Sequence, residues 1–257
     1  GNGGNVRLVY GTFWKETLNT HLRHCEEGNP DEAIYPSGLL RRQRSPQPPR
    51  NDRELKNMHK KSYGQHFLRD ESVVENIVDA AAIQPGELVI EVGPGGGALT
   101  KRLAEVENDL ILIEADRDLI EGLRQTYPRA TIVHADAAQV DFDALTQGKR
   151  WVFVSNLPYN AGNAILEAVF HAKNVPSRLV VMVQKEVGER MMAAAGEMSV
   201  LSVATQIFCA VKRVCTVKPG AFVPPPKVDS VVLEMIPHTE INTNAEEIIG
   251  LAKIGFA

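Results

Sequence analysis

Short apolar runs alternate with amphipathic segments along most of the chain from Ser72 onward. The runs recur at residues 88–92, 110–113, 131–133, 151–154 and 179–183. Runs of this length are typical of buried parallel strands, and the amphipathic segments between them, such as 118–127 and 164–172, predict helices. Strands that alternate with helices predict an α/β protein with a doubly wound, mostly parallel sheet.

Both ends of this α/β region carry further signals. Ser72 is expected to cap the first helix at its N-terminus, with Glu75 at the capping-box position. Residues 211–236 are rich in β-branched side chains around proline-containing turns. This pattern predicts an antiparallel hairpin that closes the sheet.

Residues 1–57 lack the hydrophobic periodicity that builds a core, and we expect a disordered or non-native extension there. Residues 41–50 combine arginine with proline and contain no aromatic side chain, which favours a solvated tail over an RNA-binding arm. Met58 is then a candidate start of the protein proper. We expect the main domain at residues 58–237 and a further segment at residues 238–257.

The composition is that of a soluble protein, with 44% hydrophobic and 23% charged residues and no apolar run long enough for a membrane span. Three cysteines without CxxC spacing favour a reducing compartment, and we expect a cytoplasmic protein. The net charge of −4 gives no global sign of nucleic-acid binding. His21, His24 and Cys25 are close in sequence but lack a fourth ligand, so we expect no metal.

A glycine-rich turn, Gly93-Pro94-Gly95-Gly96-Gly97, follows the first apolar run. The second run leads to Glu114, which can hold a ribose diol, and Asp136 follows the third run, where it can meet an adenine amine. The turn also fits G-x-G-x-x-G/A, which keeps a nicotinamide-dependent dehydrogenase as a competitor. Pro94 stiffens the turn, and Glu91 suits a ligand without a pyrophosphate. These features favour S-adenosylmethionine over a dinucleotide.

The tetrapeptide Asn156-Leu157-Pro158-Tyr159 follows the fourth run. An adenine N6 is a poor nucleophile, so an enzyme that uses it must hold both N–H groups and orient the lone pair. The Asn156 side-chain oxygen and a carbonyl at the Leu157-Pro158 turn can accept these hydrogen bonds, and Tyr159 offers a stacking face. The alternative is a strand that ends in a proline turn, with Tyr159 covering the core.

Four motifs together resemble one family. They are Gly64-Gln65-His66-Phe67-Leu68, Glu91-Val92-Gly93-Pro94-Gly95, Asn156-Leu157-Pro158-Tyr159 and Phe222-Val223-Pro224-Pro225-Pro226-Lys227-Val228-Asp229-Ser230. Their order is similar to that in the ribosomal small-subunit RNA adenine N6,N6-dimethyltransferase family, which includes the bacterial kasugamycin-resistance dimethyltransferase. The resemblance implies a Rossmann-like class I methyltransferase fold. It also implies S-adenosylmethionine-dependent dimethylation of two adjacent adenosines in a hairpin loop near the 3′ end of that RNA.

The resemblance also assigns roles to single residues. For the cofactor it implies His66 and Leu68 at the methionine end, Gly93 under the cofactor, Glu114 at the ribose and Asp136 at the adenine. His66 stands where many relatives carry asparagine.

For the acceptor base, the resemblance implies Asn156, which also serves the cofactor, together with the Pro158 carbonyl and Tyr159. Phe222 is a candidate for the opposite face of the base. The alternatives are a helix-entry histidine for His66 and core packing for Leu68 and Phe222.

The resemblance further implies a small helical domain after the hairpin. Residues 238–257 are expected to begin that domain and to stop short of its basic run, leaving a truncated C-terminal part. The partner is expected to be small-subunit ribosomal RNA or an immature small subunit, bound by a monomer. Related large-subunit RNA methyltransferases and a non-catalytic ribosome-assembly factor remain alternatives.

Overall fold

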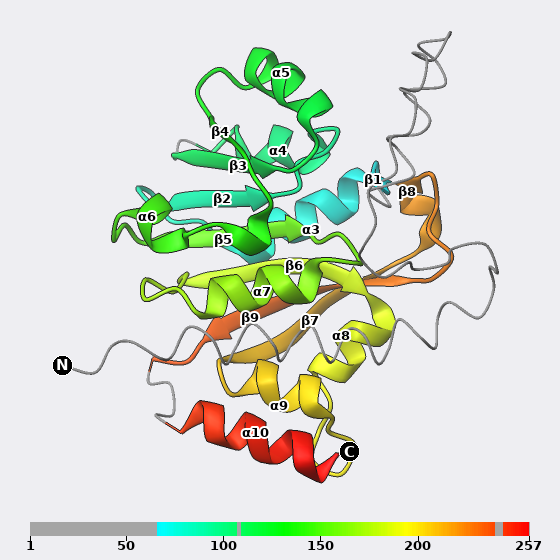
Figure 1. Cartoon of the computed structure of the whole chain (residues 1–257). Helices are drawn as coiled ribbons and strands as arrows, with labels where there is room; N and C mark the ends of the chain where they lie inside the picture. Colours follow the sequence, from blue (N-terminus) through cyan, green and yellow to red (C-terminus); the bar gives the residue numbers. More distant parts are fainter. Residues whose placement is uncertain (1–65, 107–108, 240–243, 257) are drawn as a thin grey trace, which may run out of the picture. The chain divides into compact units, whose positions relative to one another are not determined.

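The computed structural model of the chain describes residues 66–106, 109–239 and 244–256. Its centre is a seven-stranded sheet in the order β4-β3-β2-β5-β6-β9-β7 (Figure 1). The strands from β4 to β6 in that order are parallel, and β9 is antiparallel to both β6 and β7. The strands of this sheet are β2 (Leu88–Val92), β3 (Leu110–Glu114), β4 (Thr131–His134), β5 (Trp151–Asn156), β6 (Arg178–Gln184), β7 (Cys209–Val217) and β9 (Ser230–Pro237).

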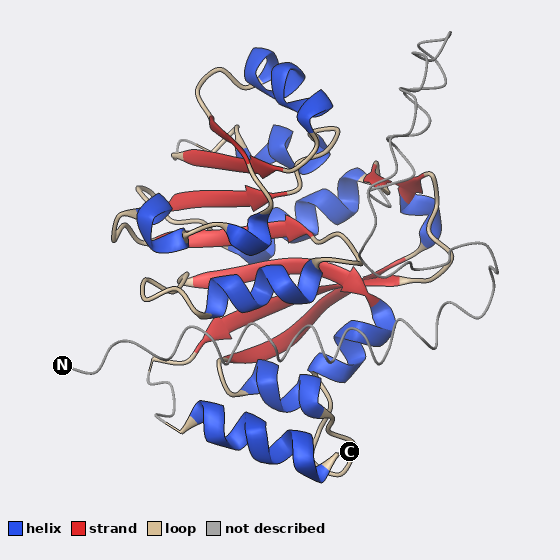
Figure 2. Cartoon of the chain, viewed as in Figure 1, coloured by secondary structure: helices blue, strands red, loops and turns tan. Residues whose placement is uncertain are grey.

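Helices cover both faces of the sheet (Figure 2). They are α3 (Glu71–Ala81), α4 (Ala98–Leu103), α5 (Arg117–Thr126), α6 (Phe142–Thr146), α7 (Gly162–Phe170), α8 (Lys185–Met191), α9 (Val200–Gln206) and α10 (Ala245–Gly255), with short 3-10 turns η1 (Ala137–Gln139) and η2 (Pro219–Ala221). Helix α3 packs against β5, β6, β7 and β9, and α7 lies across β5 and β6 on the other face (Figure 1). The sheet is therefore doubly wound, as predicted.

Side chains along β5 point alternately to the two faces of the sheet, and each face meets different helices. Val152 and Val154 belong to the core that includes the buried face of α3. Trp151 and Phe153 alternate with these valines in sequence and meet Phe142 of α6, whose ring stacks on Trp151 at a centroid distance of 5.6 Å. A strand buried on both faces needs apolar residues at every position, which explains its continuous apolar run.

The predicted strands and the closing hairpin are confirmed. Strands β7 and β9 pair antiparallel over residues 209–217 and 230–237, with a register shift between Arg213 and Cys215. The expected helix cap is wrong by two residues. Helix α3 begins at Glu71 because the Asp70 carboxylate accepts hydrogen bonds from the Ser72 and Val73 amides, at 3.0 and 3.3 Å.

A small second sheet pairs β1 (Phe67–Leu68) with β8 (Phe222–Val223) in antiparallel register, Phe67 opposite Val223 and Leu68 opposite Phe222. It joins the segment before α3 to the loop between β7 and β9. Two motifs separated by more than a hundred residues thus meet at the edge of the sheet that carries the site.

Residues 64–257 form one compact unit, in which α10 packs against α9 and buries Ala245 and Ile249. The expected boundary between residues 237 and 238 stays a prediction. The expected extension at residues 1–57 lies outside the described residues. In the described ranges, no helix has the length and apolar character needed to cross a membrane.

Candidate active site

Four predicted residues lie at or just after the carboxyl ends of neighbouring parallel strands. Gly93 follows β2, Glu114 ends β3, Asp136 follows β4 and Asn156 ends β5. Because β4, β3, β2 and β5 are adjacent in the sheet, these positions share one edge. This is the edge at which doubly wound sheets bind their ligands.

The glycine turn after β2 adopts backbone conformations that side chains oppose. Gly93, Gly95 and Gly97 have φ values of +69°, +53° and +81°. A Cβ atom on Gly95 would meet the Phe67 ring at 3.2 Å, so β1 closes over the turn. The turn therefore needs glycine both for its conformation and for close packing.

Glu114 holds this turn in place from the neighbouring strand. Its Oε2 accepts a hydrogen bond from the Gly95 amide at 3.1 Å, and its Oε1 accepts one from the Asp116 amide at 2.9 Å. Burial raises the pKa of Glu114, against the lowering effect of these amides. Each carboxylate oxygen can accept more than one hydrogen bond, so the group can still receive ribose hydroxyls.

Glu91 lies behind the turn and is almost fully buried. Burial raises the pKa of Glu91 to about 8, and the nearby charge of Glu114 adds to the rise. Its Oε2 and the Thr100 Oγ1 make no hydrogen bond within the described residues. The raised pKa favours the neutral carboxyl near pH 7, in the strand that leads into the glycine turn.

Asp136 is exposed at the end of β4. Its Oδ1 accepts a hydrogen bond from the Ala138 amide at 3.0 Å, and its Oδ2 accepts one from Gln139 Nε2 at 3.2 Å. These bonds cap η1 and fix the direction of the carboxylate. It can accept a further bond from an amine, as the predicted adenine contact requires.

Asn156 is oriented by the segment before α3. Its Nδ2 donates to the His66 carbonyl oxygen at 3.3 Å. The same histidine contacts the Pro224 carbonyl oxygen through Nδ1 at 2.8 Å, which requires Nδ1 to carry the proton because a carbonyl only accepts. With Nδ2 engaged, the Asn156 Oδ1 is the side-chain atom available to accept a bond from a ligand.

The Pro158 carbonyl is already occupied. It accepts hydrogen bonds from the Ala161 amide at 3.1 Å and the Gly162 amide at 2.9 Å, which form the turn into α7. Two donors use both lone pairs of this oxygen, and its predicted role at the acceptor amine is corrected for that reason. The Leu157 carbonyl is the better acceptor at this turn, since no described residue donates to it.

Tyr159 is held at both ends of its side chain. Its hydroxyl shares a hydrogen bond with Ser230 Oγ at 2.8 Å, and its ring lies 5.7 Å from the His66 ring at an angle of 35°. Burial raises the pKa of the Tyr159 hydroxyl, and Ser230 opposes the shift. The ring is half-buried and fixed in direction, which suits a stacking platform.

Comparison with known proteins shows the family of the chain. The family profile described as "Ribosomal RNA adenine dimethylase" matches residues 56–248. The chain belongs to this family. The protein named "Ribosomal RNA small subunit methyltransferase A" from Syntrophotalea carbinolica is 45% identical over 177 residues, covering 68% of this chain and 67% of the relative. The protein of the same name from Geobacter metallireducens is 42% identical over 186 residues, covering 69% and 68%.

Solved structures agree with this membership of the dimethylase family. A dimethyladenosine transferase from Plasmodium falciparum superposes with a TM-score of 0.68 at 30% identity, covering 74% of this chain and 70% of that one. The 23S rRNA methyltransferase ErmE superposes with a TM-score of 0.64 at 26% identity, covering 73% and 77%. The predicted Rossmann-like methyltransferase fold is confirmed, and the dehydrogenase alternative is set aside.

Two side chains with predicted roles at the site are buried in the core instead. Leu68 and Phe222 are 5% and 2% exposed and pack in the core beside α3. They face each other across β1 and β8, where apolar contact holds the small sheet together. The packing alternative therefore describes both side chains, and the stacking role of Phe222 is corrected for this conformation.

Sequence reasoning missed three contributors to the dimethylase site. Phe67 covers the glycine turn, Ser230 anchors Tyr159, and the Tyr127 hydroxyl donates to the Gly97 carbonyl oxygen at 3.0 Å. Phe67 and Ser230 belong to two of the four sequence motifs, and that membership could have marked them as site residues. Tyr127 belongs to none, and only the fold brings it to the turn.

No group of three or more His, Cys, Asp or Glu side chains lies together in the described ranges in a way that could hold a metal ion. His21, His24 and Cys25 lie outside those ranges.

Proposed function

We propose that the chain transfers methyl groups from S-adenosylmethionine to N6 of two adjacent adenosines in a hairpin loop near the 3′ end of small-subunit ribosomal RNA, twice on each adenosine. One structural observation carries the proposal. The Asn156 Nδ2 donates to the His66 carbonyl oxygen, which leaves Oδ1 to accept a bond from the base. Asn156 precedes Tyr159 at the end of β5, and β5 is paired with β2, the strand that leads into the glycine turn. The curated relatives cited above carry the name of a small-subunit methyltransferase, which favours this substrate over large-subunit RNA.

The residues at the strand ends fit the cofactor. The glycine turn allows close backbone approach, Glu114 can accept from the ribose hydroxyls and Asp136 from the adenine amine. His66 and Leu68 contribute backbone at the methionine end. S-adenosylmethionine supplies a methyl group that its sulfonium already activates.

At the acceptor side, Asn156 Oδ1 and the Leu157 carbonyl accept the two N6–H bonds of the adenine. This arrangement directs the nitrogen lone pair toward the methyl carbon, while the Tyr159 ring stacks on the base. The N–C bond forms as the S–C bond breaks, and the proton leaves N6 for solvent afterwards. No general base is required, because the nitrogen becomes far more acidic after transfer.

The second methylation needs only one of the two acceptors. After the first transfer N6 keeps a single N–H, so either Asn156 Oδ1 or the Leu157 carbonyl can hold it. Two acceptors from one turn thus serve both steps.

The RNA partner also bears on where the protein works and in what form. We place its activity in the cytoplasm, where small subunits are assembled, and expect it to act as a monomer without a metal ion. The in-line transfer assigned to Asn156 and Tyr159 needs no Lewis acid.

A labelled-methyl assay on under-methylated small ribosomal subunits tests the proposal. Wild type is expected to label the subunits, and Asn156→Ala to lower the rate by about a hundredfold or more, the scale of losing one preorganised polar contact to the transition state. Asn76→Ala, at an exposed position of α3, is the matched control and is expected to keep the wild-type rate. Particle binding without any label would identify a non-catalytic assembly factor instead.

A further inference from the structure

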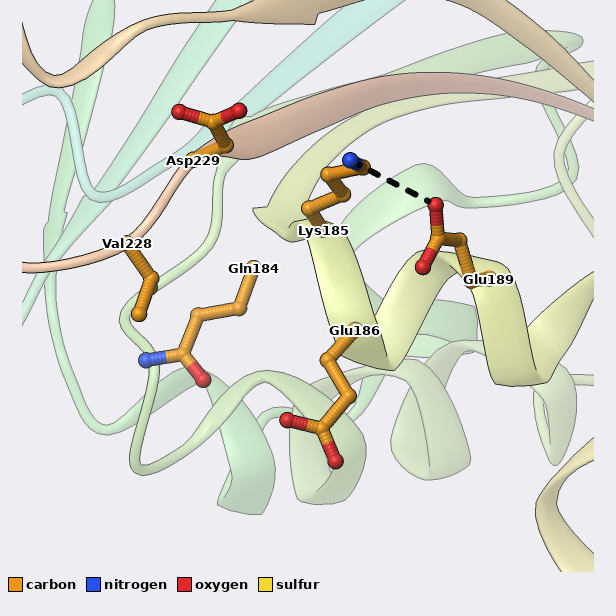
Figure 3. Close-up of a pocket in the computed structure, with 6 residues that line it drawn as sticks. All are labelled: Gln184, Lys185, Glu186, Glu189, Val228 and Asp229. Atoms are coloured by element: carbon orange, nitrogen blue, oxygen red, sulfur yellow. Dashed lines mark ion pairs between the residues drawn. The ribbon is translucent and has the colours of Figure 1, made fainter.

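An open groove lies where β6 ends and α8 begins (Figure 3). Its lining residues are Gln184, Lys185, Glu186, Glu189, Val228 and Asp229. The Lys185 amide donates to the Asp229 carbonyl oxygen at 2.9 Å and ties the two sides together. The groove is a fixed feature of the strand ends.

The groove adjoins the residue that anchors the stacking platform. Gln184 pairs in register with Ser230, and Ser230 shares the 2.8 Å hydrogen bond with the Tyr159 hydroxyl. The groove is therefore joined to the proposed stacking platform through Ser230.

The charges of the groove do not suit a phosphate. Lys185 pairs with Glu189 at 3.8 Å, and the Asp229 carboxylate pairs with Lys218 at 2.7 Å. Arg213 also faces Glu189, at 3.6 Å. The lining itself holds three carboxylates and one cation, Lys185. Lys185 and the flanking Lys218 and Arg213 are each already paired with a carboxylate, so none of these three cations is left to hold a phosphate.

Three lining groups remain for a neutral ligand. The Gln184 amide and the Glu186 carboxylate have no side-chain partner among the described residues, and they project toward the same space (Figure 3). Val228 is 47% exposed and adds an apolar surface at the other side of Gln184. A flat ring with an exocyclic amine matches this set.

We propose that the groove binds the base next to the adenosine undergoing methylation, and that it selects adenine at its 6-amino edge. This inference rests on the proposed function. A glutamine amide pairs with adenine through two bonds, accepting from N6 and donating to N7. Glu186 accepts the second N6 proton, and Val228 packs on the ring.

The same groups disfavour guanine. Its 6-oxygen would face the Glu186 carboxylate and would leave the Gln184 carbonyl oxygen without a donor. The groove therefore makes the neighbour part of the specificity of the enzyme for the adenosine that is methylated first, because an N6,N6-dimethylated neighbour no longer has an N6–H to donate.

The test uses under-methylated small subunits whose ribosomal RNA carries A-A, A-G or G-A at the adjacent pair. A-G and G-A each keep one adenosine. For wild type, this adenosine is expected to be methylated about tenfold more slowly than the same adenosine in A-A in at least one of the two, in line with the usual discrimination by a bidentate contact. Gln184→Met is expected to reduce this difference to less than about threefold, by lowering the rate on A-A. Binding of S-adenosylmethionine, followed by calorimetry, is expected to stay unchanged.

Glu186→Gln provides a second variant at an exposed position, and Gln125→Met on α5 is the matched control. Glu186→Gln should shrink the difference between A-A and the mixed pair, and Gln125→Met should preserve it. The inference is overturned if wild type treats the three pairs alike, or if both groove variants keep the full difference. Absence of methyl transfer to A-A by wild type would instead overturn the proposed function, and the base subsite with it.

Discussion

The hydroxyl of Tyr127 and the backbone of Gly97 form a latch on the glycine turn. The hydroxyl donates to the Gly97 carbonyl oxygen at 3.0 Å, and it fills the space that a Cβ atom on Gly97 would need, at 2.7 Å. Gly97 also has a φ of +81°, which disfavours any side chain. The end of α5 thus fixes the shape of the turn under the proposed cofactor.

Removing the latch is expected to weaken cofactor binding. Tyr127→Phe loses one partly buried hydrogen bond, worth about 1 kcal/mol, so the Kd for S-adenosylmethionine should rise about fivefold. Gly97→Ala combines an unfavourable φ with the clash and should weaken binding more. Calorimetry measures both. Gly122→Ala, within α5 and with free space around it, is the control and should leave the Kd unchanged; equal affinities for all three variants would contradict the latch.

Glu91 makes stability depend on pH. Burial raises its pKa from 4.5 to about 8, so between these values the folded state holds a proton that the unfolded state has lost. The free energy of unfolding should therefore fall as pH rises through this window, by at most about 1.4 kcal/mol per pH unit, and level off above it.

Glu91→Gln cannot ionise and should lack this fall. Urea unfolding of wild type and variant between pH 5 and pH 8 measures the difference. Glu75→Gln, at an exposed position of α3, should follow the wild-type curve. Parallel curves for wild type and Glu91→Gln would show that Glu91 does not titrate as described.

Glu114 is expected to matter for both the turn and the cofactor. In Glu114→Gln an NH₂ group replaces one acceptor and faces either the Gly95 or the Asp116 amide, which leaves a buried donor unpaired at about 1–3 kcal/mol. The Kd for S-adenosylmethionine should rise at least about tenfold. Glu121→Gln, exposed on α5, should bind like wild type. An unchanged Kd for Glu114→Gln would exclude the ribose role.

The Tyr159 ring should matter more than its hydroxyl. Tyr159→Phe keeps the stacking face and loses only the bond to Ser230, so kcat/KM should fall by less than about fivefold. Tyr159→Ala removes a base–aromatic stack worth about 1–3 kcal/mol, and kcat/KM should fall about tenfold or more. Ser230→Ala should resemble Tyr159→Phe. Similar losses for Phe and Ala at position 159 would argue against stacking.

The sequence allowed the sheet and the residues at its strand ends to be predicted, because buried parallel strands need continuous apolar runs and ligand groups follow them. It did not allow pairings across the fold to be predicted. The bond from Asn156 to His66 joins residues 90 positions apart, and Tyr127 reaches the glycine turn from the end of α5. Phe222 sits in a motif that resembles a binding loop, and its burial depends on packing under β1.

The position and number of methyl groups in the product test the account most directly. Under-methylated small subunits are incubated with the protein and S-adenosylmethionine, and the ribosomal RNA is digested and analysed by mass spectrometry. The account predicts N6,N6-dimethyladenosine at two adjacent loop positions with wild type and its near-absence with Asn156→Ala. Methyl groups at other atoms or on large-subunit RNA, or equal products from Asn156→Ala, would contradict it.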